Sequence, residues 1–348
     1  MASASVTIDA GVLAVPGLNG AAEDAHRYIE ALLDWAKLLD EPWVAYCENN
    51  RRSWSRRGYK PSAKRTSDDR SLGIQEYDVN TVAIVIDRLL VHTPSFETYF
   101  RIRDALTEDV STTPDILQLC TGNGLQTDLA RCLVLIAILR KHCGEDILEN
   151  ALILRKSPSR RVHVRALVHE IEHERDGLDG MLPKPPEYFE GEVLACDNFR
   201  GLLACVDESS VLHSATDDGG VEIAIRIGLY KSRLARFMEP DWDDMKRMHI
   251  GPQFVLAMHQ CCIDAPASFP ANALRAISEA IDKQNMRRAH ALRTGSGGND
   301  PQIIRRRDNA KGWRRDVDWE YHLHYWESED GTIELASIGV HGDLTIPE

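Results

Sequence analysis

The sequence contains no long hydrophobic run. Its most apolar stretch, Leu129 to Leu139, is far shorter than the ~20 residues that a membrane-spanning helix requires. We therefore expect a buried core helix at this stretch and no membrane partner. The N-terminus also has no basic segment followed by an apolar stretch and a small-residue cleavage site, so no secretory signal is expected.

Cysteine pairs with the spacing of a metal or redox motif are missing as well. None of the eight cysteines belongs to a Cys-x-x-Cys pair, so neither a zinc ribbon nor a thioredoxin-like motif is indicated. Several cysteines lie inside apolar runs, as Cys132 does, which is typical of reduced, buried thiols. A cytoplasmic location is the resulting expectation.

The chain has neither a nucleotide-type phosphate loop nor an excess of positive charge. The glycine turn at Thr121 to Gly124 has no P-loop lysine. A net charge of −13 argues against a protein that coats nucleic acid along its whole length. Any nucleic-acid contact must be local, and basic clusters at 51–65, 155–165 and 305–315 are the candidates. For any one cluster taken by itself, a solvated loop is the favoured interpretation.

A length of 348 residues favours two domains. Short apolar strands and helical patterns in residues 1–210 predict an α/β domain with a short, mainly parallel sheet. Residues 211–245 are predicted to hold a strand and a connection, because the apolar residues from Val221 to Leu229 alternate with polar or small ones. Residues 246–348 are predicted to form a smaller α+β domain with an antiparallel hairpin.

Two short apolar strands each end at an aspartate, one at Asp9 and the other at Asp197. Carboxylates at the carboxyl ends of parallel strands meet at the sheet edge where α/β proteins bind ligands. Such a group would bind Mg²⁺ or Mn²⁺, which prefer oxygen ligands and activate water. Aspartate is also common at turns, so a purely structural role for both residues stays open.

These segments resemble the PIN-like nucleases, over roughly residues 5–205. Val6 to Leu13 is similar to that family's opening strand and first acid, Tyr46 to Asn49 to a strand followed by a glutamate, and Val193 to Phe199 to its final strand and acid. The resemblance implies that catalysis and metal binding depend on Asp9, Glu48, Asp128 and Asp197. Ala10 departs from the small polar residue that usually follows the first acid, and inactive versions of such folds form a further alternative.

A different metal site is suggested by His169-Glu170-Ile171-Glu172-His173, an H-E-x-x-H match. On a helix, which we predict for Val162 to Arg175, both histidines would share one face and could bind one Zn²⁺ while Glu170 activates water. A zinc hydrolase is therefore one alternative function. The charged residues around the histidines favour a solvent-facing helix instead.

The last 45 residues join a basic block to an alternating β pattern with a turn at Asp330-Gly331. Residues 246–348 resemble a RelE-type ribonuclease toxin, in which basic and aromatic residues position RNA without a metal. The candidate nucleic-acid-binding residues are Arg305, Arg306, Arg307, Lys311, Arg314, Arg315 and His324. The histidine would be a general base, with His341 as a further candidate, and arginine would stabilise charge on phosphorus. A structural hairpin with exposed histidines is the alternative.

Taken together, the patterns favour a metal-dependent nuclease that acts on RNA before DNA. Both resembled families are prominent in toxin and defence systems, so a toxin-like or anti-phage role with a protein partner is a hypothesis by analogy. The alternative from another class is a non-catalytic scaffold, or a partner-binding subunit of a defence complex.

Overall fold

A computed structural model describes residues 4–8, 22–38, 44–46, 84–88, 101–119, 123–142, 148–153, 160–174, 182, 184–215, 217–247, 249–295 and 297–348. The chain forms two compact units, Ala4–Val206 and Asp207–Glu348. The first unit covers nearly the same residues as the α/β domain expected at 1–210. Residues 211–245, expected as a separate strand and connection, belong to the second unit.

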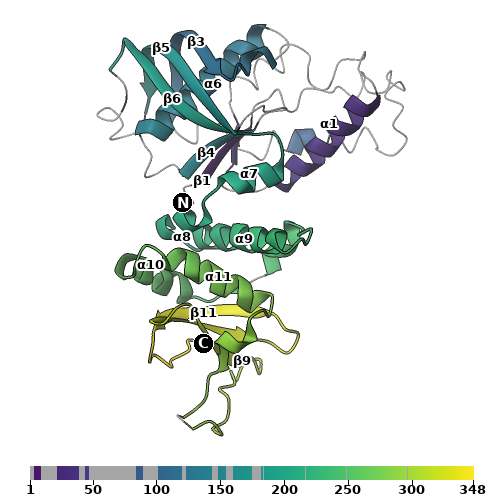
Figure 1. Cartoon of the computed structure of the whole chain (residues 1–348), viewed down its shortest axis with the longest axis vertical. Coiled ribbons are helices and arrows are strands. Elements are labelled where there is room, and N and C mark those ends of the chain that lie inside the picture. Colours follow the sequence, from purple (N-terminus) through teal and green to yellow (C-terminus); the bar gives the residue numbers. More distant parts are fainter. Residues whose placement is uncertain are drawn as a thin grey trace. The chain divides into compact units, whose positions relative to one another are not determined.

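The first unit is built on a six-stranded mixed sheet with the order β2-β1-β4-β6-β5-β3 (Figure 1). Its strands are β1 (Ala4–Ile8), β2 (Val44–Tyr46), β3 (Ile102–Thr113), β4 (Leu148–Ile153), β5 (Arg161–His173) and β6 (Glu187–Cys196). The strands β2, β1, β4 and β6 are mutually parallel, whereas β5 pairs antiparallel with both β6 and β3. The two short strands expected to end before Asp9 and before Asp197 are confirmed as β1 and β6, and the long strands β3 and β5 extend the sheet beyond them.

The core of the first unit surrounds α6 (Asn123–His142). Every residue from Cys132 to Leu139 is fully buried, as expected for the most apolar run of the sequence. The opposing sheet face supplies Val162, Val164, Ala166 and Val168 of β5, together with Phe189 and Val193 of β6. No helix among the described residues is long and apolar enough to cross a membrane.

The helix expected at Val162–Arg175 is wrong, because this segment forms the strand β5. Buried and exposed residues alternate from Arg161 to Val168, which is the period of a strand with one buried face. The inward residues are mostly β-branched, and the fully exposed ones, Arg161, His163 and Arg165, are charged or imidazole side chains. A period of two, not the charge density, was the informative signal in this segment.

The remaining helices of the first unit are short or lie at its flank. Among the described residues they are α1 (Ala22–Trp35), η2 (Ala36–Leu38), η4 (Leu117–Leu119), α7 (Phe199–Cys205) and a short helical segment at 84–88. The helix α7 begins three residues after β6 ends, and its N-cap Asn198 accepts a hydrogen bond from the Gly201 amide at 2.7 Å. This tight connection fixes the direction in which the chain leaves the sheet.

The second unit has three layers, with two helical layers on one face of a five-stranded sheet (Figure 1). Its helices are α8 (Glu208–Ser214), α9 (Asp218–Ala235), η5 (Asp243–Arg247), α10 (Phe254–Asp264), α11 (Phe269–Ile281) and η6 (Met286–Arg288). Its strands, in the sheet order β7-β11-β10-β9-β8, are β7 (His249–Ile250), β8 (Ala289–Ala291), β9 (Lys311–Asp316), β10 (Tyr321–Glu327) and β11 (Ile333–Val340). The expected hairpin is confirmed as β10 and β11, which are antiparallel.

The strand expected at Val221–Leu229 is wrong, because these residues lie within α9. Asp217 caps this helix by accepting a hydrogen bond from the Gly220 amide at 2.9 Å. Nearly every side chain from Gly220 to Tyr230 is buried, since α9 packs against both α8 and α11. A helix that is buried on most sides can carry apolar residues around its whole circumference. The alternation of apolar residues from Val221 to Leu229 therefore does not indicate a strand.

Candidate active site at the carboxyl edge of the first sheet

The carboxyl ends of the four parallel strands are aligned at one edge of the first sheet. Ile8 of β1 pairs with Tyr46 of β2 and with Ile153 of β4, and Ile153 pairs with Cys196 of β6. These four residues are the last of their strands. The chain therefore leaves four parallel strands at the same level. This is the edge at which open α/β sheets place their ligands.

Asp197 lies at this edge, directly after β6. Its side chain is exposed, and its Oδ1 accepts a hydrogen bond from Asn198 Nδ2 at 2.8 Å. Asp34 of α1 approaches the same turn, where its Oδ2 accepts a hydrogen bond from the Phe199 amide at 2.7 Å. The other oxygen of Asp34 is paired with Lys37 at 2.6 Å. Asp34 therefore has a structural task, joining α1 to the start of α7.

The helix α6 runs antiparallel to β6 and brings Asp128 towards the carboxyl edge. Lys141, near the end of α6, donates a hydrogen bond to the Glu190 carbonyl at 3.0 Å, and Ala137 packs against Gly191. Asp128 precedes Ala137 by nine residues, or about 13.5 Å of helix. Cys196 follows Gly191 by five residues, or about 16.5 Å of strand. Asp128 and Cys196 thus reach similar levels along the strand direction.

Arg160, directly before β5, places a positively charged residue at the same edge. The Ala195 amide donates a hydrogen bond to the carbonyl of Arg160 at 3.0 Å, and Arg161 is in register with Leu194. The Arg160 side chain is exposed, whereas Arg161 is paired with Glu192 at 3.2 Å. Arg160, which belongs to the basic cluster 155–165, therefore lies beside the turn that carries Asp197.

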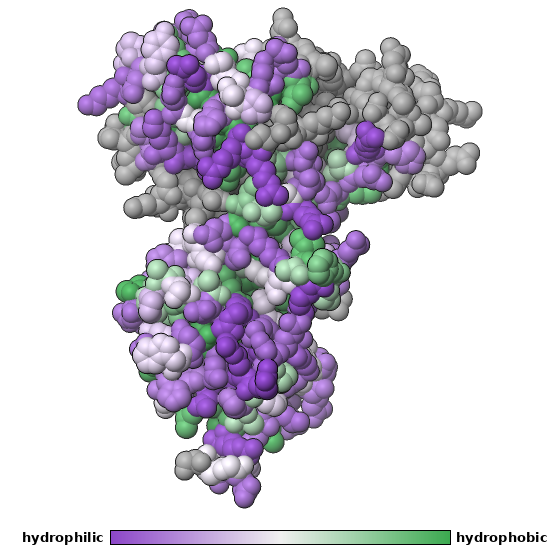
Figure 2. Space-filling model, viewed as in Figure 1, coloured by the Kyte–Doolittle hydropathy of each residue, from purple (hydrophilic) through white to green (hydrophobic). Residues whose placement is uncertain are grey.

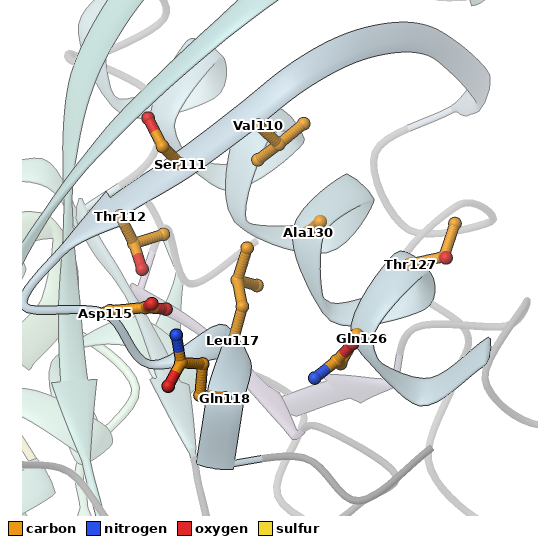
Figure 3. Close-up of a pocket in the computed structure, with 9 residues that line it drawn as sticks. All are labelled: Val110, Ser111, Thr112, Asp115, Leu117, Gln118, Gln126, Thr127 and Ala130. Carbon is orange, nitrogen blue, oxygen red and sulfur yellow. The ribbon is translucent and has the colours of Figure 1, made fainter. Parts of the chain in front are cut away.

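A pocket of about 370 Å³ opens between the end of β3, η4 and the first turns of α6 (Figure 3). Thr113 of β3 is level with Glu192 of β6 through His163, so this pocket lies towards the carboxyl end of the sheet. Its polar lining consists of Ser111, Thr112, Asp115, Gln118, Gln126 and Thr127. The Thr112 hydroxyl oxygen already accepts a hydrogen bond from the Ile116 amide at 3.0 Å.

Two of the four predicted acids, Asp9 and Glu48, lie outside the described residues. Asp9 follows Ile8 in the sequence, and Glu48 comes two residues after Tyr46, so both follow strands that end at the carboxyl edge. Within the described part of the chain, no three histidine, cysteine, aspartate or glutamate side chains are grouped as metal ligands. Of the four predicted acids, Asp128 and Asp197 lie among the described residues.

Comparison with protein-family models, curated proteins and solved structures finds no match to this chain. The assignment of function therefore rests on the geometry of the two units.

The predicted zinc ligands His169 and His173 lie on a strand. Four residues of β5 span about 13 Å, whereas two imidazoles must come within about 4 Å of each other to share one Zn²⁺. His169 Nε2 instead contacts Glu108 Oε2 on the neighbouring strand β3 at 3.1 Å. The geometry that the zinc hydrolase required, a helix with both histidines on one face, is not formed.

In the second unit, two of the predicted nucleic-acid-binding arginines are buried. Arg305 is 1% exposed and pairs with Asp308 and Glu334 at 2.6 and 2.8 Å, beside the ring of Trp326. Arg315 is fully buried, donating to Glu279 Oε2 at 2.7 Å and to the Gln284 carbonyl at 2.6 Å. Neither guanidinium group is exposed, so their burial argues against the predicted phosphate contacts.

His324 is also buried, which argues against its predicted contact with RNA as a general base. Burial lowers its pKa to about 4, so the imidazole is neutral at pH 7. Its Nδ1 lies 3.3 Å from Ser337 Oγ. The neighbouring His322 is buried too, and its Nε2 lies 3.1 Å from Asp316 Oδ1 and 3.3 Å from Nδ1 of the exposed His341. The expected exposed histidine face is thus largely enclosed.

The rest of the basic block remains at the surface. Arg306 and Lys311 are exposed, Arg307 is exposed but paired with Glu334, and Arg314 is half-buried. The face of the second unit that Figure 2 shows is mostly hydrophilic. Of the seven predicted binding residues, Arg306, Lys311 and Arg314 are therefore the ones that the structure leaves for a phosphate backbone.

Asp34 and Arg160 were not predicted as neighbours of the candidate site. Asp34 lies in the last turn of an amphipathic helix, where nothing in its local pattern separates it from other surface acids. Arg160 was predicted only as a member of the basic cluster 155–165. Its position follows from the pairing of β5 with β6, which could not be predicted while β5 was expected to be a helix.

Proposed function

We propose that the first unit hydrolyses phosphodiester bonds in nucleic acid, RNA before DNA, at the carboxyl edge of its sheet. The supporting observation is that four parallel strands end in register, with Asp197 directly after one of them and Arg160 beside it. Carboxylates and a guanidinium at one edge suit a phosphate substrate, since acids bind cations and arginine binds phosphate oxygens.

The residues at this edge fit a hard divalent cation. Asp197 is exposed, so an oxygen can face solvent and a metal ion, and α6 brings the carboxylate of Asp128 to a similar level. Asp9 and Glu48 would complete an all-oxygen set of the kind that Mg²⁺ and Mn²⁺ prefer. When bound, such an ion lowers the pKa of water and stabilises charge that develops on phosphorus.

The protein side chains would then divide the remaining work. Asp197 and Asp128 would orient the ion, while Asn198 holds one oxygen of Asp197 in place. Arg160 would bind a phosphate oxygen of the substrate strand and keep it at the edge. In the second unit, Arg306, Lys311 and Arg314 would add non-specific contacts to phosphates, which weaken as salt increases.

The deciding experiment measures cleavage of labelled single-stranded RNA and DNA by the full-length protein, with Mg²⁺, Mn²⁺ or a chelator. Asp197→Asn preserves the acceptor for Asn198 but removes the charge, and we expect it to lower the cleavage rate about 100-fold or more. Asp9→Asn should act in the same way.

Glu170→Gln is the matched control. Glu170 is an exposed carboxylate on β5, nine residues and about 30 Å from Arg161 at the carboxyl edge. It should keep wild-type activity. Unchanged activity in Asp197→Asn would refute the proposed site. A folded wild-type protein that cleaves neither substrate with either metal would favour the partner-binding alternative.

A further inference from the structure

Two cysteines of the first unit lie side by side at the end of β6. Cys196 is the last residue of β6, and Cys205 is the last residue of α7. Their sulfur atoms are 3.6 Å apart. A two-residue turn and the first six residues of α7 separate the two cysteines, and the helix brings Cys205 back beside the end of β6.

We infer that this pair is an oxidative modification site, at which a peroxide converts the two thiols into an intramolecular disulfide. The sulfur atoms must approach by about 1.5 Å to reach the ~2.05 Å of an S–S bond. Rotation of the two side chains and a small shift of α7 can supply that approach. The helix is short and ends at Cys205, so its last turn is the part most easily moved.

The two cysteines differ in access, which sets the order of the steps. Cys205 is half-buried and reachable by a small peroxide, whereas Cys196 is buried. The Cys205 thiolate attacks hydrogen peroxide, the O–O bond breaks, and Cys205 becomes a sulfenic acid as one water leaves. The Cys196 sulfur then attacks the Cys205 sulfur, and the hydroxyl group departs with a proton as a second water. In sum, two thiols lose two electrons and two protons to one peroxide.

The local environment supports this assignment of roles. Cys196 is buried and lies behind the more accessible Cys205, 3.6 Å from its sulfur, so peroxide meets Cys205 first. The adjacent cysteines of α10 offer a contrast. Burial raises the pKa of Cys261 and of Cys262 to about 11, and both are buried, so neither is a ready target for peroxide.

Oxidation would also reach the proposed nuclease centre, a consequence that rests on the proposed function. Drawing Cys196 towards α7 shifts the residue directly before Asp197. Catalytic groups must be held within about 0.5 Å of their working positions. We therefore expect the disulfide form to cleave nucleic acid more slowly, with recovery after a dithiol reductant.

The test is peptide mapping of the full-length protein after treatment with hydrogen peroxide and alkylation of the remaining thiols. Trypsin cuts after Arg200, so Cys196 lies in the peptide 176–200 and Cys205 in the peptide 201–226, each with one cysteine. We expect these peptides to be joined by a disulfide, with a mass two hydrogens below their sum. Reduction should separate them.

Two variants and a matched control make the result decisive. Cys205→Ser should abolish the linked peptide and leave Cys196 reduced, whereas Cys196→Ser should leave Cys205 as a sulfenic acid that a dione reagent labels. Cys261→Ser, the matched control, should form the linked peptide as the wild type does. Alkylation of both Cys196 and Cys205 after peroxide treatment would overturn the inference. Because this readout is mass, it stands or falls independently of nuclease activity.

Discussion

In the first unit, Asp197 and Arg160 are exposed where parallel strands end, whereas in the second unit Arg305 and Arg315 are enclosed and paired. Both sets come from segments that are rich in charge. What separates them is exposure: the first set lies at the surface, whereas Arg305 and Arg315 are buried and form ion pairs with Glu279, Asp308 and Glu334. A dense basic block is therefore not by itself a binding surface. Burial decides whether a guanidinium supports the fold or remains available for a ligand.

The largest effect should come from Arg315→Ala. The substitution leaves Glu279 with less compensation in a buried site, and breaking a buried ion pair costs about 3–5 kcal/mol. Urea unfolding should show a lower midpoint with an unchanged slope. Arg314→Ala is the control, because this neighbour is only half-buried, and it should change the free energy of unfolding by about 0.5 kcal/mol or less. Equal losses in both variants would erase the contrast between the two arginines.

A second effect concerns pH, through His324. Its folded-state pKa of about 4 lies below the ordinary value of 6.5, so the unfolded chain binds more protons between these values. Stability should therefore be full above pH 6.5 and fall as the pH drops towards 4, by about 3 kcal/mol from this residue. His324→Asn, which keeps a polar atom near Ser337, should flatten this dependence. An unchanged pH profile in the variant would mean that other groups cause it.

A smaller effect tests the packing that positions α6 on β6. A methyl group added at Gly191 would come 2.8 Å from the ring of Phe189 and 3.1 Å from Ala137, which is too close for either. Gly191→Ala should therefore cost about 1–3 kcal/mol of stability. Gly298→Ala meets no atom within 4 Å and should be nearly neutral. Thermal unfolding of the two variants compares them directly, and a neutral Gly191→Ala would contradict the close approach of α6 that brings Asp128 to the edge.

The smallest effect should appear in nucleic-acid affinity. Arg306→Ala and Lys311→Ala each remove one exposed positive charge. Each should reduce the slope of log affinity against log salt by about 1 without changing sequence preference. Glu329→Gln, at an exposed acid of the same unit, should not weaken binding. If Arg306→Ala, Lys311→Ala and Glu329→Gln all show the wild-type salt slope, the second unit does not contact phosphates.

Much of the first sheet was predictable, because short apolar strands such as Val6–Ile8 and Val193–Cys196 carry a strong local signal. The helix α6 was equally clear from its uninterrupted apolar run. The segments β5 and α9 were exchanged in type, since β5 is charged on its outer face and α9 is buried on most of its surface. In both cases tertiary surroundings, which local propensity does not contain, decided the outcome.

The candidate site was predictable only as far as strand ends are local. Asp197 could be placed at the carboxyl edge because its strand and the following turn are adjacent in sequence. The contacts of Arg315 could not be foreseen, because Glu279 and Gln284 reach it from α11 and the turn after it. Nor could the approach of Cys205 to Cys196, which depends on how α7 folds back after β6.

The pairing of β1 with β4 has a consequence for how the protein is made. These strands are adjacent in the sheet although about 140 residues separate them in the chain, and β6 joins them later still. During synthesis, the carboxyl edge cannot be assembled until the ribosome has released β6, beyond Cys196. Under the proposed function, the message that encodes the protein would therefore not be cleaved until more than half of the chain has emerged.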